Sequence, residues 1–400
     1  MPGRWKVLAL LFAVRTAMAL QFQSVAALAP LLRHDLDVDI ADIGFLIGLY
    51  LSPGIALALP GGAIGKRFGD KLVVVAGLAL MTTGGLVMTF SHAWAPELAG
   101  RLLAGIGGVL LNVLMSKMVT DWFAGKEIAT AMAIFVNSWP IGIALALLVL
   151  PPIAASGGVA AAFLFTSLLV ALGLFAMAGL YRAPPPQQAA APAAVTKADF
   201  PTLLAVTAAG LIWGLYNGAI AMIFSFGPSM LAERGWSVQA AGSVTSVTLW
   251  LVGLSVPLGG FLADRTGRFR LVLVGGLLVS AAMLLVAARV DTAVPAFAVL
   301  GLVCGLSAGP IMSLPSRVLL PETRAVGMGV FFTLFYVIAV VAPVLGGQAA
   351  NVAGSVRVTF DLGALMLVSC CPVLWLFELL ASGSLAAKRV PHIPRSKAAS

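Results

Sequence analysis

The chain contains very little charge. Charged residues make up 10% of its 400 residues and hydrophobic residues 60%, whereas soluble domains carry about 25% charge. A soluble protein this apolar could not cover its surface with polar atoms, so the composition predicts a chain solvated by lipid. Because a membrane-spanning helix needs roughly 20 apolar residues, a chain of this length can hold about a dozen spans joined by short loops.

Residues that build catalytic, metal or disulfide sites are also scarce. The three cysteines lie in apolar runs, and the three histidines lie in loops or in the tail. This distribution predicts no disulfide framework, no metal site and no cofactor. The chain lacks the G-x-x-x-x-G-K-[ST] motif of ATP-binding loops, and no acid, Ser/Lys or His set clusters within its apolar runs. We therefore expect that the protein is not an enzyme.

Acidic residues are missing from the middle of the predicted spans. Of the 15 Asp and Glu residues, Glu97 lies near one end of the fourth apolar run and Glu378 near one end of the last. The others lie in loops or at the ends of runs. A binding site for a cationic drug would require a deep carboxylate, as would a proton relay built on one, so the sequence favours neither.

Long apolar runs are what the sequence does have. They predict twelve spans, near 7–31, 42–64, 72–91, 95–117, 127–150, 158–181, 200–226, 238–262, 271–289, 294–318, 325–348 and 358–381. Pro interrupts several of them, at Pro53, Pro140, Pro257, Pro310 and Pro343, which buried membrane helices tolerate. A Pro/Ala/Gln-rich break separates an N-terminal bundle (1–182) from a C-terminal one (200–384), with a linker at 183–199 and a basic tail at 385–400.

The bases are distributed unevenly between the two sets of loops. Of the 24 Lys and Arg residues, only Arg33, Arg234, Arg289 and Arg357 fall in the loops on the side away from the termini, and only Arg15 and Arg101 fall within spans. The remaining Lys and Arg residues fall in the loops and tails on the same side as the termini. Because such bases gather on the cytoplasmic side of a membrane, this distribution predicts that both termini are cytoplasmic. The net charge of +9 is thereby explained without nucleic acid. We expect a monomeric, multi-pass protein in a bacterial inner (plasma) membrane, with the lipid bilayer as its surroundings.

The chain carries a repeated motif about half its length apart. The stretch Gly260–Arg268 reads GFLADRTGR, and a weaker copy at Gly62–Asp70 reads GAIGKRFGD. A second pair supports this alignment, since charged residues precede the similar stretches AMAIF at 131–135 and GMGVF at 327–331. The repetition predicts a duplicated membrane protein whose halves are equivalent.

The later copy resembles the loop motif of the major facilitator superfamily, in which G-x-L-x-D-R-x-G-R joins the second and third helices of each half. The residues that carry this resemblance are Gly260, Asp264, Arg265, Gly267 and Arg268, and in the first copy Gly62, Lys66, Arg67, Gly69 and Asp70. The first copy departs from the family, with Lys66 in place of Asp and Asp70 in place of a base. Arg101 and Gly105 resemble the family's R-x-x-x-G motif of the fourth helix.

This resemblance implies an all-α membrane protein with twelve transmembrane helices in two six-helix pseudo-repeats. It also implies secondary active transport by alternating access, with the cavity lined by helices 1, 4, 7 and 10. In the family the motif Asp closes the cytoplasmic side against a helix start of the other half. The departures in the first copy therefore predict a swapped clamp of Lys66 with Glu322, Asp70 with Arg67 or Arg324, and Asp264 with Lys126. Alternatively, Lys66 points into the cytosol or at lipid phosphate.

Arg15 is the first ionisable residue within a span. It lies about ten residues into the first helix, roughly 15 Å from its start, so we expect that its side chain does not reach water. Gln23 lies closer to the face of Arg15 than Gln21 does, and we expect it beside Arg15 in the cavity. Two interpretations stay open: Arg15 contacts the substrate, or it bonds to carbonyls or an Asn of a neighbouring helix.

Arg101 is the second such residue. Glu97, Arg101 and Asn112 fall along one face of the fourth helix. The spacing of Glu97 and Arg101 predicts mutual neutralisation, whereas the resemblance gives Arg101 a role in coupling. Asn112 is expected to line the cavity, as are Trp213, Tyr216 and Asn217 on the seventh helix, and more weakly Asn137, Trp139, Ser307 and Tyr336.

Two cations in the spans and no deep acid favour a small anionic substrate. We expect a secondary active transporter for such a solute, with a proton or a counter-solute as a second partner. The alternatives are a proton-linked multidrug or neutral-solute exporter, and a membrane receptor that keeps the same fold without transporting.

Overall fold

The computed structural model describes residues 3–90, 93–123, 127–183, 199–319 and 323–383. Within these ranges all the regular secondary structure is helical. The elements are α1 (Gly3–Ala27), α2 (Ala29–Leu36), α3 (Ile40–Leu51), α4 (Pro53–Phe68), α5 (Asp70–Thr89), α6 (Trp94–Phe123), α7 (Ile128–Leu180), α8 (Phe200–Glu233), α9 (Val238–Thr266), α10 (Phe269–Ala287), α11 (Ala293–Cys304), η1 (Gly305–Ser307), α12 (Ala308–Ser313), η2 (Pro315–Arg317), α13 (Arg324–Ala353) and α14 (Arg357–Gly383).

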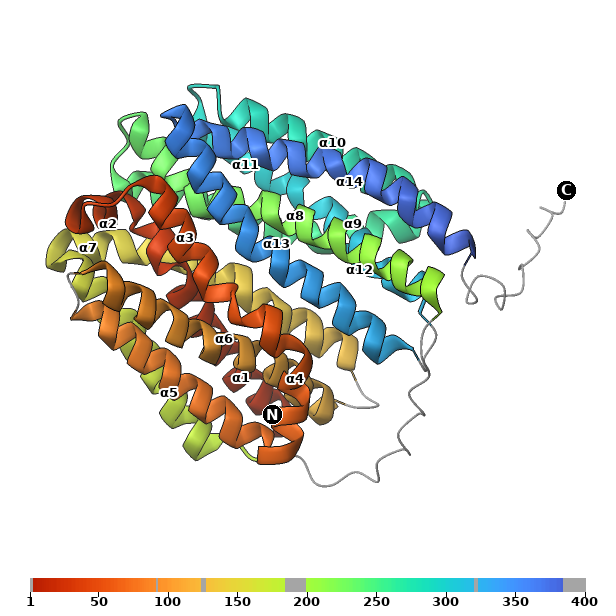
Figure 1. Cartoon of the computed structure of the whole chain (residues 1–400), viewed down its shortest axis with the longest axis horizontal. Helices are drawn as coiled ribbons and strands as arrows, with labels where there is room; N and C mark the ends of the chain where they lie inside the picture. The colour runs from red at the N-terminus through yellow and green to blue at the C-terminus, as the bar shows by residue number, and fades with distance from the viewer. Residues whose placement is uncertain (1–2, 91–92, 124–126, 184–198, 320–322, 384–400) are drawn as a thin grey trace, which may run out of the picture.

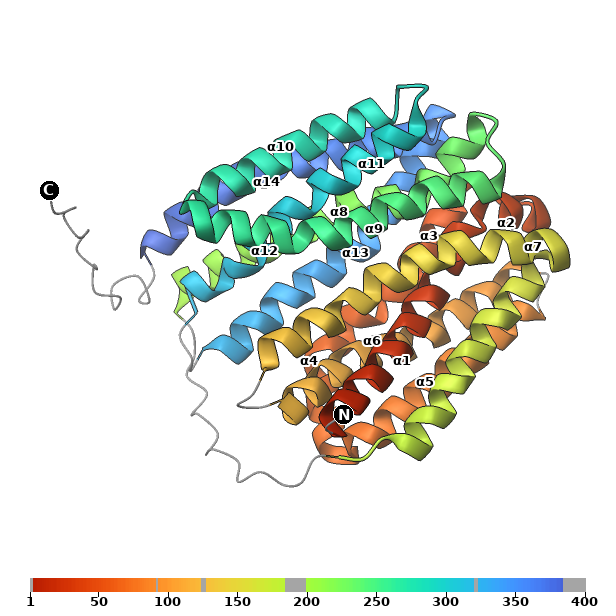
Figure 2. The ribbon, with the colours of Figure 1, turned by 180° about the vertical axis from the view of Figure 1, so that it is seen from behind.

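The helices form two bundles that lie side by side. Helices α1–α7 make up the N-terminal half and α8–α14 the C-terminal half, as both views show (Figures 1 and 2). We use the name "terminal end" for the part of the molecule where α1 begins and where α7 and α14 finish (Figure 1). The end that carries α2 and the turn between α13 and α14 is the opposite end. The predicted linker and tail lie almost wholly outside the described residues.

Eleven helical segments of the described chain are long and apolar enough to span a membrane, whereas the sequence predicted twelve spans. The difference arises in α7. Its apolar part, Ile134–Leu180, has 47 residues and would be about 70 Å long if straight, more than twice a bilayer core of about 30 Å. At Gly158 the backbone leaves the helix (φ 76°, ψ 174°), a conformation that glycine permits. The chain reverses there (Figure 2), so α7 supplies two of the predicted spans.

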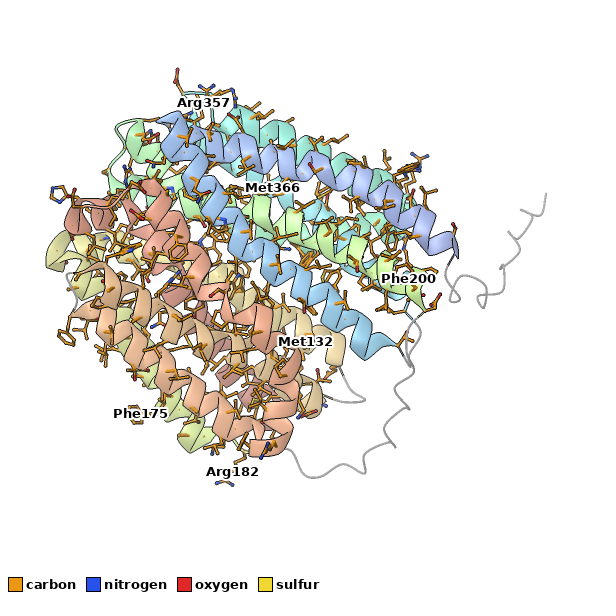
Figure 3. All side chains as sticks on the ribbon, in the orientation of Figure 1. Met132, Phe175, Arg182, Phe200, Arg357 and Met366 are labelled. Carbon is orange, nitrogen blue, oxygen red and sulfur yellow. The ribbon has the colours of Figure 1, made fainter. Side chains whose placement is uncertain are left out.

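The outer surface of the bundles is apolar. The side chains of Phe175 and Val352 are 70% and 90% exposed, and Figure 3 shows Phe175 projecting away from α7. Large exposed apolar side chains also occur on α5, α9, α10 and α14. Such a surface requires lipid, so the chain is an integral, multi-pass membrane protein.

Two predicted spans are broken in the structure. The second span divides into α3 and α4 at Pro53, and the tenth divides into α11, η1, α12 and η2. Side chains of the C-terminal half bond the backbone groups at the second break. The Ser255 hydroxyl accepts from the Gly305 N–H (3.1 Å) and donates to the Gly301 carbonyl (3.0 Å), and the Tyr216 hydroxyl donates to the Cys304 carbonyl (2.8 Å).

The two halves meet closely near the opposite end, where α3 crosses α13. A Cβ at Gly44 would collide with the Pro343 carbonyl, and one at Gly347 would lie 2.6 Å from the Ile40 carbonyl. The glycines therefore let the two backbones touch. Beyond this crossing, the Asn351 side chain donates to Asp39 (2.8 Å).

A second crossing joins α7 of the N-terminal half to α9 of the C-terminal half. The Ser246 hydroxyl donates to the Ala144 carbonyl (2.9 Å). A Cβ at Gly242 would collide with the Leu147 carbonyl. Small residues therefore allow close approach at both crossings, one on each side of the interface between the halves.

Candidate functional site

Arg15 is held at the interface between the halves by neutral groups. Its side chain is 8% exposed. The Nε and Nη2 atoms donate to Asn112 Oδ1 (3.2 and 3.0 Å), and Nη1 donates to the carbonyls of Phe135 (3.0 Å) and Val136 (3.1 Å) and to Ser138 Oγ (3.3 Å). These contacts bring together α1, α6 and α7, and they fix the plane of the guanidinium.

A hydrogen bond extends this cluster into the other half. Asn112 Nδ2 donates to the Tyr336 hydroxyl on α13 (3.1 Å). The Tyr336 ring in turn packs so closely on Gly54 that no Cβ would fit there. Arg15, Asn112 and Tyr336 thus form a continuous hydrogen-bonded chain from the N-terminal half to the C-terminal half. The sequence placed all three in the cavity, without predicting that they would bond to one another.

Aromatic rings cover the other sides of the guanidinium. Arg15 lies over the rings of Phe135 (4.7 Å to the centroid) and Trp139 (5.8 Å). Trp139 packs against Phe22 (5.1 Å between centroids), and Phe22 contacts Phe224 of the C-terminal half (6.1 Å). Such rings attract a cation through their faces and lower the local dielectric.

The charge of Arg15 has no matching acid in the described part of the chain. No ion pair within 4.0 Å involves it, and each of its hydrogen-bond acceptors is neutral. One interpretation left open by the sequence was that Arg15 bonds to carbonyls or to an Asn of a neighbouring helix, and the structure contains both kinds of contact. They orient the guanidinium but leave a net positive charge in an apolar interior, where it attracts an anion strongly.

Arg101 is buried more deeply and is bonded differently. It is 1% exposed. Its three nitrogens donate to the carbonyls of Leu46 (3.0 Å), Gln21 (3.3 Å) and Phe22 (2.7 Å), and the guanidinium lies 4.7 Å from the Tyr50 ring centroid. Arg101 therefore ties α6 to α1 and α3.

Glu97 and Arg101 make no direct ion pair among the described residues, so their predicted mutual neutralisation would act over a longer distance and stays a prediction. The carbonyls of α1 and α3 draw the guanidinium away from its own helix. Glu97 is 2% exposed, and its Oε2 atom has no hydrogen-bond partner among the described residues.

The predicted residues of the C-terminal half make their contacts mainly within that half. Tyr216 is buried against the broken span, as described above. Asn217 donates to the Trp213 carbonyl of its own helix (2.8 Å), and Ser307 donates to the Leu273 carbonyl (3.0 Å). Trp213 stacks on Tyr216 (5.7 Å between centroids). These four residues therefore bond to backbone carbonyls or stack on one another within the C-terminal half, and none of their described hydrogen bonds involves Arg15.

Two further predicted residues lie on α1 and α7, the helices that carry Arg15 and its carbonyl partners. Gln23 is fully buried and donates to the Phe224 carbonyl on α8 (2.6 Å), so it bridges the halves. Asn137 is partly exposed on α7, directly before Ser138. Ser138 and the carbonyls of Phe135 and Val136, which also bind Arg15, were not predicted. Backbone acceptors on a neighbouring helix cannot be identified from residue types.

Most of the predicted clamp cannot be placed. Lys126 and Glu322 lie outside the described residues, as do the side chains of Lys66, Asp264 and Arg324 and the surroundings of Gly62. The partner of Asp70 is Lys117 of α6, which also pairs with Asp121 (3.0 Å). Among the described contacts Asp70 therefore pairs with Lys117 rather than with Arg67, and the predicted pairing with Arg324 stays a prediction because the side chain of Arg324 lies outside the described residues. Asp70 lies at the start of α5, where the end of α6 brings Lys117 closer than the preceding loop brings Arg67.

The two copies of the loop motif share one backbone feature. Gly69 and Gly267 both have positive φ (88° and 63°), so each ends a helix in a conformation that glycine favours. Gly260 meets open space on its free side, Arg265 lies over the Phe261 ring (5.6 Å), and Arg268 is exposed. The repeated motif therefore places a glycine with positive φ at the same position in the two halves, although the ψ of Gly69 (127°) differs from that of Gly267 (5°).

A sequence model described as Major Facilitator Superfamily matches residues 11–229 and 202–399. The chain belongs to the major facilitator superfamily. Each half matches the model separately, which agrees with the two bundles and with the repeated loop motif.

Curated relatives of this superfamily member are distant. It is 24% identical over 279 residues to a hexuronate transporter of Bacillus subtilis, which covers 64% of each chain. It is 29% identical over 150 residues to the 4-hydroxybenzoate transporter PcaK of Pseudomonas aeruginosa (34% of each chain). It is 26% identical over 153 residues to the human choline/ethanolamine transporter FLVCR2 (38% of this chain, 29% of the relative). Each match spans less than two thirds of the relative's own length.

Solved structures share its fold. A bacterial homologue of the human lysosomal transporter Spinster, in an inward-facing and occupied conformation, superposes with a TM-score of 0.77 at 16% identity, covering 98% of this chain and 99% of that one. The nucleoside transporter NupG gives a TM-score of 0.73 at 15% identity, with 94% and 99% coverage. Both likenesses concern the fold alone.

Proposed function

We propose that the protein is a secondary active transporter of a small anionic solute, which binds at Arg15 between the two halves. The observation that carries this proposal is the unmatched charge of Arg15, buried at the interface with neutral partners only. An anion entering there would gain charge-assisted, bidentate bonds from a planar guanidinium whose orientation is already fixed.

The position of Arg15 also suits alternating access. Its hydrogen-bonded chain crosses to Tyr336 of the other half, so an anion that displaces Asn112 from the guanidinium would alter the contact between halves. Binding energy would then be available to shift their relative arrangement. The clamp predicted for Lys66 and Asp264 remains a further proposal for the terminal end.

Two of the relatives support an anion, since hexuronate and 4-hydroxybenzoate are both carboxylates. The relative named for choline supports a cationic or neutral solute instead, which is the second candidate. The contacts of Arg15 favour the anion, because a cation beside an unmatched guanidinium would be repelled. Proton-linked multidrug export would face the same repulsion with cationic drugs.

Uptake into proteoliposomes tests this function. We expect the purified protein to accumulate at least one labelled carboxylate, for example a hexuronate or 4-hydroxybenzoate, and not labelled choline. Arg15→Ala should abolish that uptake, and Arg15→Lys should retain only part of it because an ammonium lacks the planar fork. Arg289→Ala, an exposed arginine paired with Asp361 (2.7 Å), is the matched control and should transport normally.

Normal uptake by Arg15→Ala would contradict the anion site. Uptake of choline with no carboxylate uptake would favour the second candidate. Thermal unfolding of each variant in detergent should accompany the assay, so that loss of uptake is separated from loss of the fold.

A further inference from the structure

A small cavity with a few polar lining residues lies within the N-terminal half, at the opposite end. It has a volume of about 180 Å³ and is enclosed by α2, α5, α6 and the reversal of α7. Its polar lining comes from Asp35, Thr89 and Glu97, and its apolar walls include Gly158 and Phe163. The side chain of Asp35 is 53% exposed, so the cavity has its mouth there.

Glu97 is the buried group of this cavity. Its side chain is 2% exposed, yet its Oε2 atom has no hydrogen-bond partner among the described residues. Arg101, one turn further along α6, directs its three nitrogens at carbonyls of α1 and α3. Because a buried carboxylate oxygen without a partner is costly, the unbonded Oε2 indicates that the site accommodates a positively charged ligand.

The charges around the cavity fix the charge of that ligand. With both carboxylates ionised, Asp35 and Glu97 supply two negative charges, and Arg101 supplies one positive charge close to Glu97. The His34 ring lies 3.5 Å from Asp35, beside the mouth. The balance leaves one negative charge, which one monovalent cation would neutralise and a divalent cation would exceed.

The ligand atoms also fit a small, hard cation. Two carboxylates and the hydroxyl of Thr89 offer oxygen only. The Thr89 hydroxyl donates its proton to the Gly85 carbonyl (2.8 Å), so its oxygen remains free to accept. Oxygen donors of this kind bind a proton or an alkali cation.

We propose that this cavity is the coupling-ion site of the transporter, where Glu97 binds a proton or Na⁺ that enters past Asp35. The inference rests on the proposed function, since it assigns the second partner of the same transport cycle. It concerns a site separate from Arg15, however, and it can be tested without any substrate.

The helices that enclose the cavity also build the anion site. Helix α6 carries both Glu97 and Asn112, and α7 carries both the cavity wall at Gly158 and the carbonyls that hold Arg15. A change in packing around Glu97 therefore reaches Asn112 along one rigid helix, about 22 Å away at 1.5 Å per residue. Coupling of this kind is reciprocal, so the cation should raise anion affinity by the factor by which the anion raises cation affinity.

Thermal unfolding of the purified chain in detergent tests the site in two arms. In the first, Na⁺ replaces N-methyl-D-glucamine at constant ionic strength and fixed pH. In the second, pH is lowered from 8 to 5 in the absence of Na⁺. We expect a saturating rise of a few degrees in Tm in the arm that supplies the natural cation, because a ligand that binds only the folded state stabilises it.

Glu97→Gln should abolish this rise, because the amide keeps the shape of the side chain and removes its charge. Asp35→Asn, at an exposed position, should weaken the apparent cation affinity by several-fold while leaving the fold intact. Asp291→Asn is the matched control, since it removes an exposed acid from the other half and should leave the titration unchanged. Comparison with Glu97→Gln also separates the contribution of Glu97 from that of His34 and Asp35 at the mouth of the cavity.

Absence of a saturating rise in both arms would overturn the proposal, as would an unchanged rise in Glu97→Gln. If Glu97→Gln cannot be purified, an unchanged cation affinity in Asp35→Asn overturns it alone. Because these measurements use no solute, a transporter that carries no anion could still bind the cation, and an anion transporter could fail to bind it. The two proposals therefore fail separately.

Discussion

Two buried arginines in the N-terminal half use their hydrogen-bonding capacity in different ways. Arg101 donates to three carbonyls on two other helices and has no route to a solute in the described contacts. Arg15 donates to an Asn side chain that a solute could displace. The same residue type therefore ties helices together at one position and offers a binding charge at the other.

The structural role of Arg101 leads to a stability prediction. Arg101→Ala should lower the free energy of unfolding by about 2–3 kcal/mol, because several charge-assisted bonds are lost and their acceptors stay buried. The measurement is denaturant or thermal unfolding in detergent. The control Arg289→Ala removes an exposed ion pair, which is worth about 0–1 kcal/mol. Equal losses in the two variants would contradict the structural role.

Sequence reasoning at this scale found the charged residues but not their partners. Arg15, Asn112 and Tyr336 could be selected because polar residues are rare in apolar runs. Their mutual bonds depend on how α1, α6 and α13 rotate about their axes, which spacing along one helix does not determine. Among the described residues, Glu97 and Arg101 make no direct ion pair for a related reason, since the carbonyls of α1 and α3 bind the guanidinium.

At the scale of elements, the crossing of α3 with α13 is one of two close backbone contacts described between the halves. It requires glycine at Gly44 and Gly347, where each backbone lies against the other. The two helices belong to different halves, so any opening of the opposite end must separate them. The crossing therefore sets how far that end is closed.

We predict that Gly44→Ala opens the opposite end. An added Cβ cannot fit against the Pro343 carbonyl, and the rigid helices must move apart. Spin labels at the exposed positions His34 and Asp291 should show a longer mean distance in Gly44→Ala than in the unchanged chain, as measured by double electron–electron resonance. Gly275→Ala on α10, where a Cβ meets open space, should leave the distance distribution unchanged. An unchanged distribution in Gly44→Ala would mean that this crossing does not set the closure.

The sequence predicted most of the spans but not where they break. Prolines mark the break at Pro53 and lie close to the one that follows Cys304, yet helices run through Pro140, Pro257 and Pro343 without interruption. Whether a proline breaks a helix depends on side chains that can bond the freed backbone. Ser255 and Tyr216 do so at the broken tenth span, and they come from other helices.

At the scale of the whole molecule, the distribution of bases makes a prediction about orientation. The terminal end carries Arg67, Lys71, Lys117, Arg182, Arg265, Arg268 and Arg270 beside the helix ends. The positive-inside rule then places this end in the cytoplasm. We propose that the opposite end, where the halves are packed, faces outward in a bacterial plasma membrane.

Cysteine labelling in intact cells tests this orientation. In a background without the native cysteines, Asp37→Cys should react with a membrane-impermeant maleimide, because it lies exposed at the opposite end. Arg182→Cys, exposed at the terminal end, should react only after the cells are permeabilised. Labelling of Arg182→Cys in intact cells would contradict the proposed orientation.

The reversal at Gly158 also decides whether the N-terminal half crosses the bilayer an even or an odd number of times. If α7 ran straight, the chain would cross the bilayer one time fewer, and everything after it would be inverted relative to the first half. The second copy of the loop motif would then face the other compartment, and the pseudo-symmetry of the two halves would be lost. A single residue with a left-handed φ therefore keeps the duplicated halves in the same sense, so that one compartment meets both copies of the motif.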